Sequence, residues 1–207
     1  SYAEIVSMLQ GEVFTGEDVG MTEADVQVLI EHSPFFNGKT GFAGDPSPFA
    51  AESVHVVMKR AIELFLPEKS LMGETVAIKG LGKVGGALLA RLAKDTAKVI
   101  GADIDERAVE KARTAIPELA VEPSDAVAFV ECLVYAPCAF GREVRMDNFD
   151  RFRAKIICGG ANNQLEQPSL ANQLMMRGVL YVPDYLANAG GLINVSEELE
   201  GDGYHPE

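Results

Sequence analysis

Apolar positions in the middle of the chain change from a helical spacing to short continuous runs. Residues 48–66 place Val54, Met58 and Phe65 on one side of a long helix that Pro67 ends. The runs that follow are short and bounded by polar residues. We expect strands over residues 75–79, 98–102, 133–136, 154–158 and 179–182. Strands that alternate with helical segments predict a parallel sheet covered on both faces.

The segments between these strands carry helical patterns over residues 84–94, 106–115 and 173–177. Upstream, residues 2–10 have an amphipathic pattern, and Thr22 has the side chain and position of a helix cap. Residues 33–48 are rich in Gly, Pro and Ser, which favours a linker. We therefore expect a boundary between residues 1–40 and 41–207, with an α/β fold in the second part: a Rossmann-type, doubly wound, mostly parallel sheet.

A glycine motif directly follows the first strand and opens the next helix: Gly80-Leu81-Gly82-Lys83-Val84-Gly85. In such a motif the first glycine allows a tight turn, the second lets the backbone approach a pyrophosphate, and the third lets the helix pack on the strand. The helix N-terminus then offers backbone amides and partial positive charge to the phosphates. This context predicts dinucleotide binding, whereas the alternative is a glycine turn without a ligand. Lys83 either contacts phosphate or is a solvated side chain.

The strand after the motif ends at Asp103, near the distance of about 20 residues at which such folds place an acidic residue. A carboxylate there accepts hydrogen bonds from both ribose hydroxyls of NAD, and it repels the extra phosphate of NADP. The pattern therefore favours NAD. The alternative for Asp103 is a cap for the helix that begins near Glu106.

The composition and net charge of the chain argue against some classes of binding partner. The chain has 47% hydrophobic and 24% charged residues and a net charge of -13, which argues against binding to nucleic acid or to anionic membranes. No apolar run approaches the roughly 20 residues of a membrane span, and no signal peptide is visible. The cysteines are odd in number and not closely paired, so we expect reduced thiols in a cytoplasmic protein, with no metal site: Cys132, Cys138 and Cys158. The histidines form no ligand cluster with them.

Six motifs in a fixed order carry a resemblance to a known family. They are Thr15-Gly16-Glu17-Asp18-Val19-Gly20, Gly44-Asp45-Pro46-Ser47-Pro48, residues 80–86, Ala136-Pro137-Cys138-Ala139, Gly160-Ala161-Asn162-Asn163-Gln164-Leu165, and Tyr181-Val182-Pro183-Asp184-Tyr185 followed by Asn188-Ala189-Gly190-Gly191. From about Thr15 to Val195 the chain resembles the glutamate/leucine/phenylalanine/valine dehydrogenases, particularly their leucine and valine branch.

The resemblance implies NAD-dependent oxidative deamination of a small L-amino acid, of branched-chain type, to the 2-oxo acid and ammonia, by a homo-oligomer. Asp18 matches the acidic residue that moves protons to and from the substrate nitrogen, a role that suits a carboxylate in a closed cleft. The cofactor-binding positions implied by the motifs and the family are Gly80, Leu81, Gly82, Lys83, Val84, Gly85, Gly86, Asp103, Ala136, Pro137, Asn162 and Asn188. Asn163 lies in a similar loop.

The chain also departs from the family pattern. Ala50 stands where a threonine is usual, Ser53 where a glycine is usual, Lys79 where glutamine is usual and Leu133 where an aspartate is usual. The family's lysine-bearing, glycine-rich substrate segment has no counterpart before Asp18. We therefore expect residues 1–40 to be a remnant of a substrate domain and the chain to be a piece that is inactive alone. The alternative is a non-catalytic NAD-binding paralogue or regulatory module.

Overall fold

The computed structural model describes the chain except residues 17–19, 39–43 and 198–207. By its contacts the chain divides into two compact units. One comprises Ser1–Phe49 together with the chain from Gly191 onward, and the other is Ala50–Gly190. The division expected from the sequence, at residues 40 and 41, stays a prediction.

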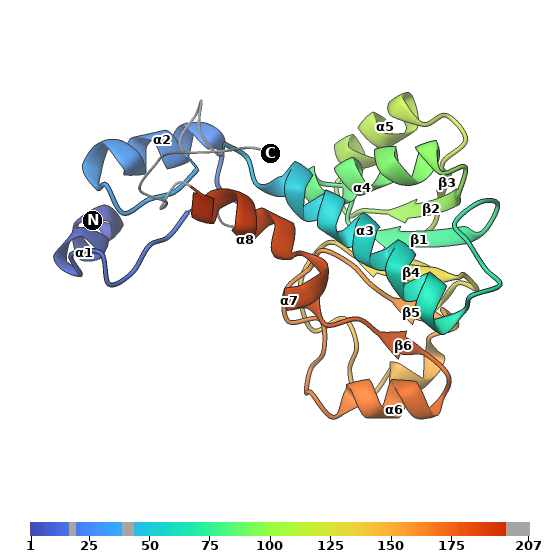
Figure 1. The fold of residues 1–207 in the computed structure, drawn as a ribbon. Coiled ribbons are helices and arrows are strands. Elements are labelled where there is room, and N and C mark those ends of the chain that lie inside the picture. Colours follow the sequence, from blue (N-terminus) through green and yellow to red (C-terminus); the bar gives the residue numbers. More distant parts are fainter. Residues whose placement is uncertain (17–19, 39–43, 198–207) are drawn as a thin grey trace. The chain divides into compact units, whose positions relative to one another are not determined.

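A six-stranded parallel sheet forms the centre of the larger unit (Figure 1). Its strands are β1 (Thr75–Lys79), β2 (Lys98–Ala102), β3 (Ala120–Val121), β4 (Val134–Pro137), β5 (Ile156–Ile157) and β6 (Leu180–Tyr181). They lie in the order β3-β2-β1-β4-β5-β6, with β1 pairing both β2 and β4. This order reverses direction between β1 and β4, and ligands of such folds bind outside the carboxyl ends of the strands at that reversal. The structure thus confirms the predicted α/β, doubly wound fold.

Helices cover both faces of this sheet (Figure 1). They are α3 (Ser47–Phe65), α4 (Lys83–Lys94), α5 (Glu106–Ala115), α6 (Leu170–Met176) and α7 (Asp184–Ala187), with 3-10 turns η1 (Val127–Phe129) and η2 (Phe149–Arg151). Most of α8 (Ala189–Ser196) belongs to the other unit. Successive side chains of β1 point to opposite faces of the sheet and so belong to two different apolar cores. Val76 and Ile78 pack with Met58 of α3 and Leu88 of α4, whereas Ala77 belongs to the core that contains η1 and α6.

The smaller unit contains α1 (Tyr2–Met8) and α2 (Glu23–His32). Thr22 caps α2 as predicted, because its side chain accepts a hydrogen bond from the backbone N–H of Asp25 and Asp25 bonds back to Thr22. A small apolar cluster holds this unit together, with Ala3, Val6 and Phe36 buried.

The predicted elements agree best in the first half of the sheet-bearing unit. The strands expected at 75–79 and 98–102 and the helix expected at 106–115 have the observed bounds. The last three expected strands are present but shifted or shorter, and α6 begins at Leu170, before the predicted 173. Strand β3 and helices α7 and α8 were not predicted. β3 and α7 have only two and four residues, and Gly190 and Gly191 make the start of α8 a poor helix former. No described helix is long and apolar enough to cross a membrane.

Candidate functional site

The turn after β1 requires glycine at its first position. Gly80 has φ +95°, and a Cβ there would lie 2.8 Å from backbone atoms of Cys138 and Ala139. Its backbone N–H donates to the carbonyl oxygen of Ala102 over 2.7 Å, which joins the turn to the end of β2. The loop is therefore set at the carboxyl ends of the two adjacent strands.

The other two glycines of the motif have opposite surroundings. At Gly85 a Cβ would lie 1.8 Å from the carbonyl oxygen of Gly80, so the helix can approach the turn only without a side chain. At Gly82 a Cβ would meet no atom of the described residues within 4 Å. Gly82 is the N-cap of α4 and offers its first N–H groups no side-chain acceptor. Open space thus lies at the start of a helix whose dipole favours an anion.

Asp103 lies beside this loop, directly after β2. One carboxylate oxygen accepts a 2.6 Å hydrogen bond from the backbone N–H of Leu81, and the other accepts a 2.9 Å bond from the N–H of Asp105. The N-cap of α5 is Asp105, whose side chain bonds the N–H of Arg107. Asp103 is therefore not the helix cap considered as its alternative role. A carboxylate has about four acceptor sites, so Asp103 retains capacity for further donors.

A second group of predicted residues follows β4, β5 and β6. Ala136 and Pro137 are buried at the end of β4. Asn188 donates from Nδ2 to Oδ1 of Asn162 over 2.6 Å and to the carbonyl oxygen of Gly160 over 3.1 Å. Because the strands are parallel, these residues lie at the same edge of the sheet as the glycine loop. Asp18 falls outside the described residues, so its predicted role stays a prediction.

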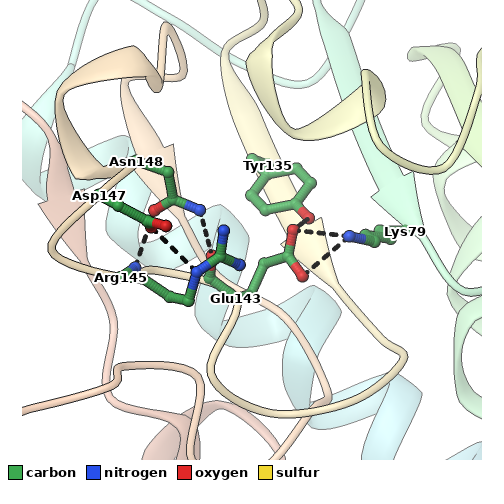
Figure 2. A network of polar contacts seen from close by, with 6 residues as sticks. All are labelled: Lys79, Tyr135, Glu143, Arg145, Asp147 and Asn148. Atoms are coloured by element: carbon green, nitrogen blue, oxygen red, sulfur yellow. Dashed lines mark hydrogen bonds and ion pairs between the residues drawn. The ribbon is translucent and has the colours of Figure 1, made fainter.

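Lys79, Glu143 and Tyr135 form an ionic cluster next to the glycine loop, which the sequence did not predict (Figure 2). Nζ of Lys79 donates to both carboxylate oxygens of Glu143, over 2.9 and 3.0 Å, and the hydroxyl of Tyr135 donates to Oε1 over 3.0 Å. The side chains of Lys79 and Glu143 are only 22% and 14% exposed. Burial, together with the Glu143 charge, raises the pKa of Tyr135 well above its ordinary value, which keeps its hydroxyl protonated as a donor. Glu143 lies in an irregular loop, and no local pattern marks it.

The loop that carries Glu143 is itself tied to the asparagine loop. The backbone N–H of Arg142 donates to the carbonyl oxygen of Asn163 over 2.7 Å, and that of Val144 donates to Gln164 over 3.0 Å. Asn148 donates from its side chain to the Glu143 carbonyl oxygen over 3.0 Å (Figure 2). The ion pair therefore connects the residue before the glycine loop to the segment that supports Asn162.

Comparisons with known proteins agree with this geometry. Residues 103–203 match the family described as Glutamate/Leucine/Phenylalanine/Valine dehydrogenase. A leucine dehydrogenase from Bacillus subtilis is 36% identical over 204 residues, which cover 97% of this chain and 56% of that protein. A valine dehydrogenase from Streptomyces virginiae is 37% identical over 206 residues, covering 97% of this chain and 58% of that protein.

This chain belongs to the Glutamate/Leucine/Phenylalanine/Valine dehydrogenase family. The crystal structure of L-tryptophan dehydrogenase from Nostoc punctiforme superposes with a TM-score of 0.79 at 32% identity, over 99% of this chain and 58% of that one. The predicted resemblance is confirmed. The chain spans about half the length of the relatives it matches.

The departures from the dehydrogenase pattern are accommodated structurally. Ser53 donates from Oγ to the carbonyl oxygen of Ala50 over 2.9 Å and accepts from the backbone N–H of Gly190 over 3.0 Å. Leu133 is buried in the core that α3 and α4 share with the sheet. Lys79 has Glu143 as its partner. Ser53, Leu133 and Lys79 thus each have a hydrogen-bonding, packing or ionic role in the fold.

The three cysteines of this dehydrogenase-family chain are free thiols. Burial raises the pKa of Cys132 to about 12 and that of Cys138 to about 11, and it also raises the pKa of Cys158. Such thiols are protonated near neutral pH and are poor nucleophiles. Among the described residues no group of three or more His, Cys, Asp or Glu side chains could hold a metal ion.

Proposed function

We propose that this chain supplies the NAD-binding part of an NAD-dependent L-amino acid dehydrogenase. The observation that carries the proposal is the open approach at Gly82, next to a helix start and beside the carboxylate of Asp103. These features meet at the reversal of strand order, where folds of this type hold dinucleotides.

In this proposal different groups of the chain bind different parts of the cofactor. The backbone at Gly82 and the first turn of α4 bind the diphosphate, and Asp103 accepts from the adenosine ribose. Ala136 and Pro137, with Asn162 and Asn188, border the nicotinamide half. Bound NAD would supply the hydride acceptor for the α-carbon of the amino acid.

The proposed substrate is a branched-chain L-amino acid, which is converted to the 2-oxo acid and ammonia. Relatives named leucine and valine dehydrogenase support this choice, although a relative named L-tryptophan dehydrogenase has similar identity. Asp18 is the proposed proton carrier for the substrate nitrogen, since a desolvated carboxyl can have its pKa raised toward neutrality. The parent protein is proposed to act as a homo-oligomer.

We also propose that the 207-residue chain alone does not turn over amino acids, because the lysine-bearing segment implied by the family has no counterpart in it. A second candidate function is a non-catalytic NAD-binding module. The apolar Ala50 and Leu133, where the family carries polar residues, favour it. An assay of the full-length protein with NAD and L-leucine, L-valine or L-tryptophan separates the two, since turnover excludes the non-catalytic module.

Calorimetric titration with NAD and with NADP tests the cofactor site directly. Gly82→Asp places a carboxylate in the open space above the loop, so we expect it to weaken NAD binding by about a hundredfold or more. Gly82→Ala is the matched control, because it adds a Cβ in the same place without charge. The wild-type chain should prefer NAD to NADP. Unchanged NAD affinity in Gly82→Asp, or no NAD binding by the wild type, would overturn the proposal.

A further inference from the structure

The larger unit has a concave site that lies apart from the cofactor edge. It has a volume of about 540 Å³, and its lining residues are Phe129, Asp150, Arg151, Phe152, Arg153 and Arg177. Phe129 belongs to η1, which precedes β4, and Arg177 follows α6, which precedes β6. Arg151 and Arg153 lie in and just after η2, before β5. The site, here called the arginine pocket, is therefore at the amino ends of the strands, opposite the glycine loop.

The arginine pocket concentrates positive charge in a strongly acidic protein. The whole chain has a net charge of -13, yet this lining carries three guanidinium groups and a single carboxylate, that of Asp150. Among the described residues no carboxylate oxygen lies within 4.0 Å of Arg151, Arg153 or Arg177, whereas several other basic side chains are paired. Like charges without a counter-ion repel one another, so their grouping favours an anionic ligand.

Two of these guanidinium groups are held in place before any ligand arrives. Arg177 donates from Nη2 to the backbone carbonyl oxygen of Asp150 over 2.6 Å. The guanidinium carbon of Arg151 lies 3.9 Å from the centre of the Phe129 ring, a cation–π contact. Phe129 in turn makes an edge-to-face contact with the buried Phe152 at 5.4 Å. This anchoring lowers the entropy lost on binding.

We infer that the arginine pocket binds a small molecule that carries two or more phosphate charges. Guanidinium groups match phosphate oxygens with paired hydrogen bonds, and the volume is in the range of small-ligand sites. A small anion touches only this local positive region. An extended polyanion such as nucleic acid would also meet the acidic remainder of the surface, which repels it. The inference does not depend on the proposed dehydrogenase function.

Titration calorimetry with inorganic pyrophosphate at low ionic strength tests the inference. Pyrophosphate also has access to the glycine loop, so the titrations are repeated in a Gly82→Asp background, where that loop is blocked. We expect saturable binding with one site per chain to persist there. Arg153→Gln should weaken it by about tenfold, and the double variant Arg151→Gln/Arg177→Gln by more. Affinity should also fall as salt is raised.

Arg113→Gln, at an exposed position in the last turn of α5, is the matched control and should bind within about twofold of the background protein. Circular dichroism of every variant checks that the fold is retained. Loss of all pyrophosphate binding in Gly82→Asp would overturn the inference, because the anion would then bind only at the glycine loop. Normal binding by the double arginine variant would overturn it as well.

Discussion

The carboxylate of Asp103 accepts a 2.6 Å hydrogen bond from the backbone N–H of Leu81, which lies in the glycine loop. The end of β2 and the turn after β1 therefore form one hydrogen-bonded corner. The bond shows that Asp103 acts within the protein itself, by orienting the loop, besides any contact with a ribose. A variant at Asp103 consequently changes both the conformation of the glycine loop and the contact with the ribose, and different replacements separate these two effects.

Asp103→Asn retains one side-chain oxygen but loses the negative charge. We expect it to weaken NAD binding by about tenfold and to bring the NAD and NADP affinities closer together, because the repulsion of the extra phosphate is lost. Asp103→Ala, which also removes the contact to Leu81, should weaken both cofactors further. Calorimetry with each cofactor measures this, with Glu110→Gln on α5 as the control for loss of an acidic charge. An unchanged NAD-to-NADP ratio in Asp103→Asn contradicts the ribose assignment.

Gly85 and Gly82 should respond very differently to alanine. A Cβ at Gly85 would collide with the carbonyl oxygen of Gly80, so Gly85→Ala must displace α4 from the turn. We expect a loss of about 3 kcal/mol or more in the free energy of unfolding, since overpacking of this kind moves backbone. Gly82→Ala should change stability by less than about 1 kcal/mol because its Cβ meets open space. Urea denaturation of both variants checks the contrast, and equal losses would contradict it.

The Lys79–Glu143 pair should be coupled more strongly than a surface ion pair. Removing one partner leaves a largely buried charge unpaired, so Lys79→Met or Glu143→Gln should each cost about 2 kcal/mol. The double variant should cost less than the sum of the two. Lys69 and Glu74, whose side chains are 45% and 31% exposed, provide the control pair, for which coupling should stay below about 1 kcal/mol. Additive effects at Lys79 and Glu143 in a double-mutant cycle would contradict the prediction.

The features that could be predicted from the sequence are those set by residues that are close together along the chain. The strand–glycine–helix unit was predicted because a short apolar run, three glycines and a helical period follow one another directly, and Asp103 was predicted from its spacing after the motif. Lys79 and Glu143 are 64 residues apart, and only the pairing of β1 with β4 brings their neighbourhoods together. The second role of Asp103 was missed for a similar reason, since its partner is a backbone N–H whose direction depends on the turn at Gly80. The arginine pocket combines three segments that no motif connects.

The contact between His55 and Asp95 links α3 to the end of α4, and Lys59 lies 3.6 Å from the same carboxylate. Burial alone raises the pKa of Asp95, but the hydrogen bond and charge of His55, with Lys59, lower it below the ordinary value of 3.8. A lowered pKa stabilises the fold at all pH values above that of the unfolded chain, and the contribution is lost as pH falls through the folded pKa.

Asp95→Asn should therefore lower the free energy of unfolding by about 1 kcal/mol at pH 5, where the Asp95 carboxylate is ionised. The difference from the wild type should shrink below pH 3.8. Urea denaturation across this range measures the effect, with Asp147→Asn as the control at a side chain that is 72% exposed. If the stability difference between Asp95→Asn and the wild type is the same at pH 5 and at pH 3, the effect of the substitution comes from packing and not from the carboxylate charge.

The thiols should be unreactive in the folded chain. With the pKa of Cys138 raised to about 11, only about one thiol in a thousand is ionised at pH 8. Ellman's reagent at pH 8 should therefore label the native protein slowly, and all three cysteines rapidly in guanidinium chloride. Rapid labelling of any cysteine in the native protein would show that the site is more open than the structure indicates.

The two hydrogen bonds of Ser53 bring the beginning of the sheet-bearing unit against its end. Ser53 stands three residues after the unit's first residue, Ala50, and its oxygen receives the N–H of Gly190, the unit's last residue. A module whose entry and exit adjoin can be placed within another chain, or reopened elsewhere and rejoined at these ends, without stretching its backbone. Residues 50–190 therefore have the geometry of a domain that can be inserted into another chain, and Ser53 joins its two ends.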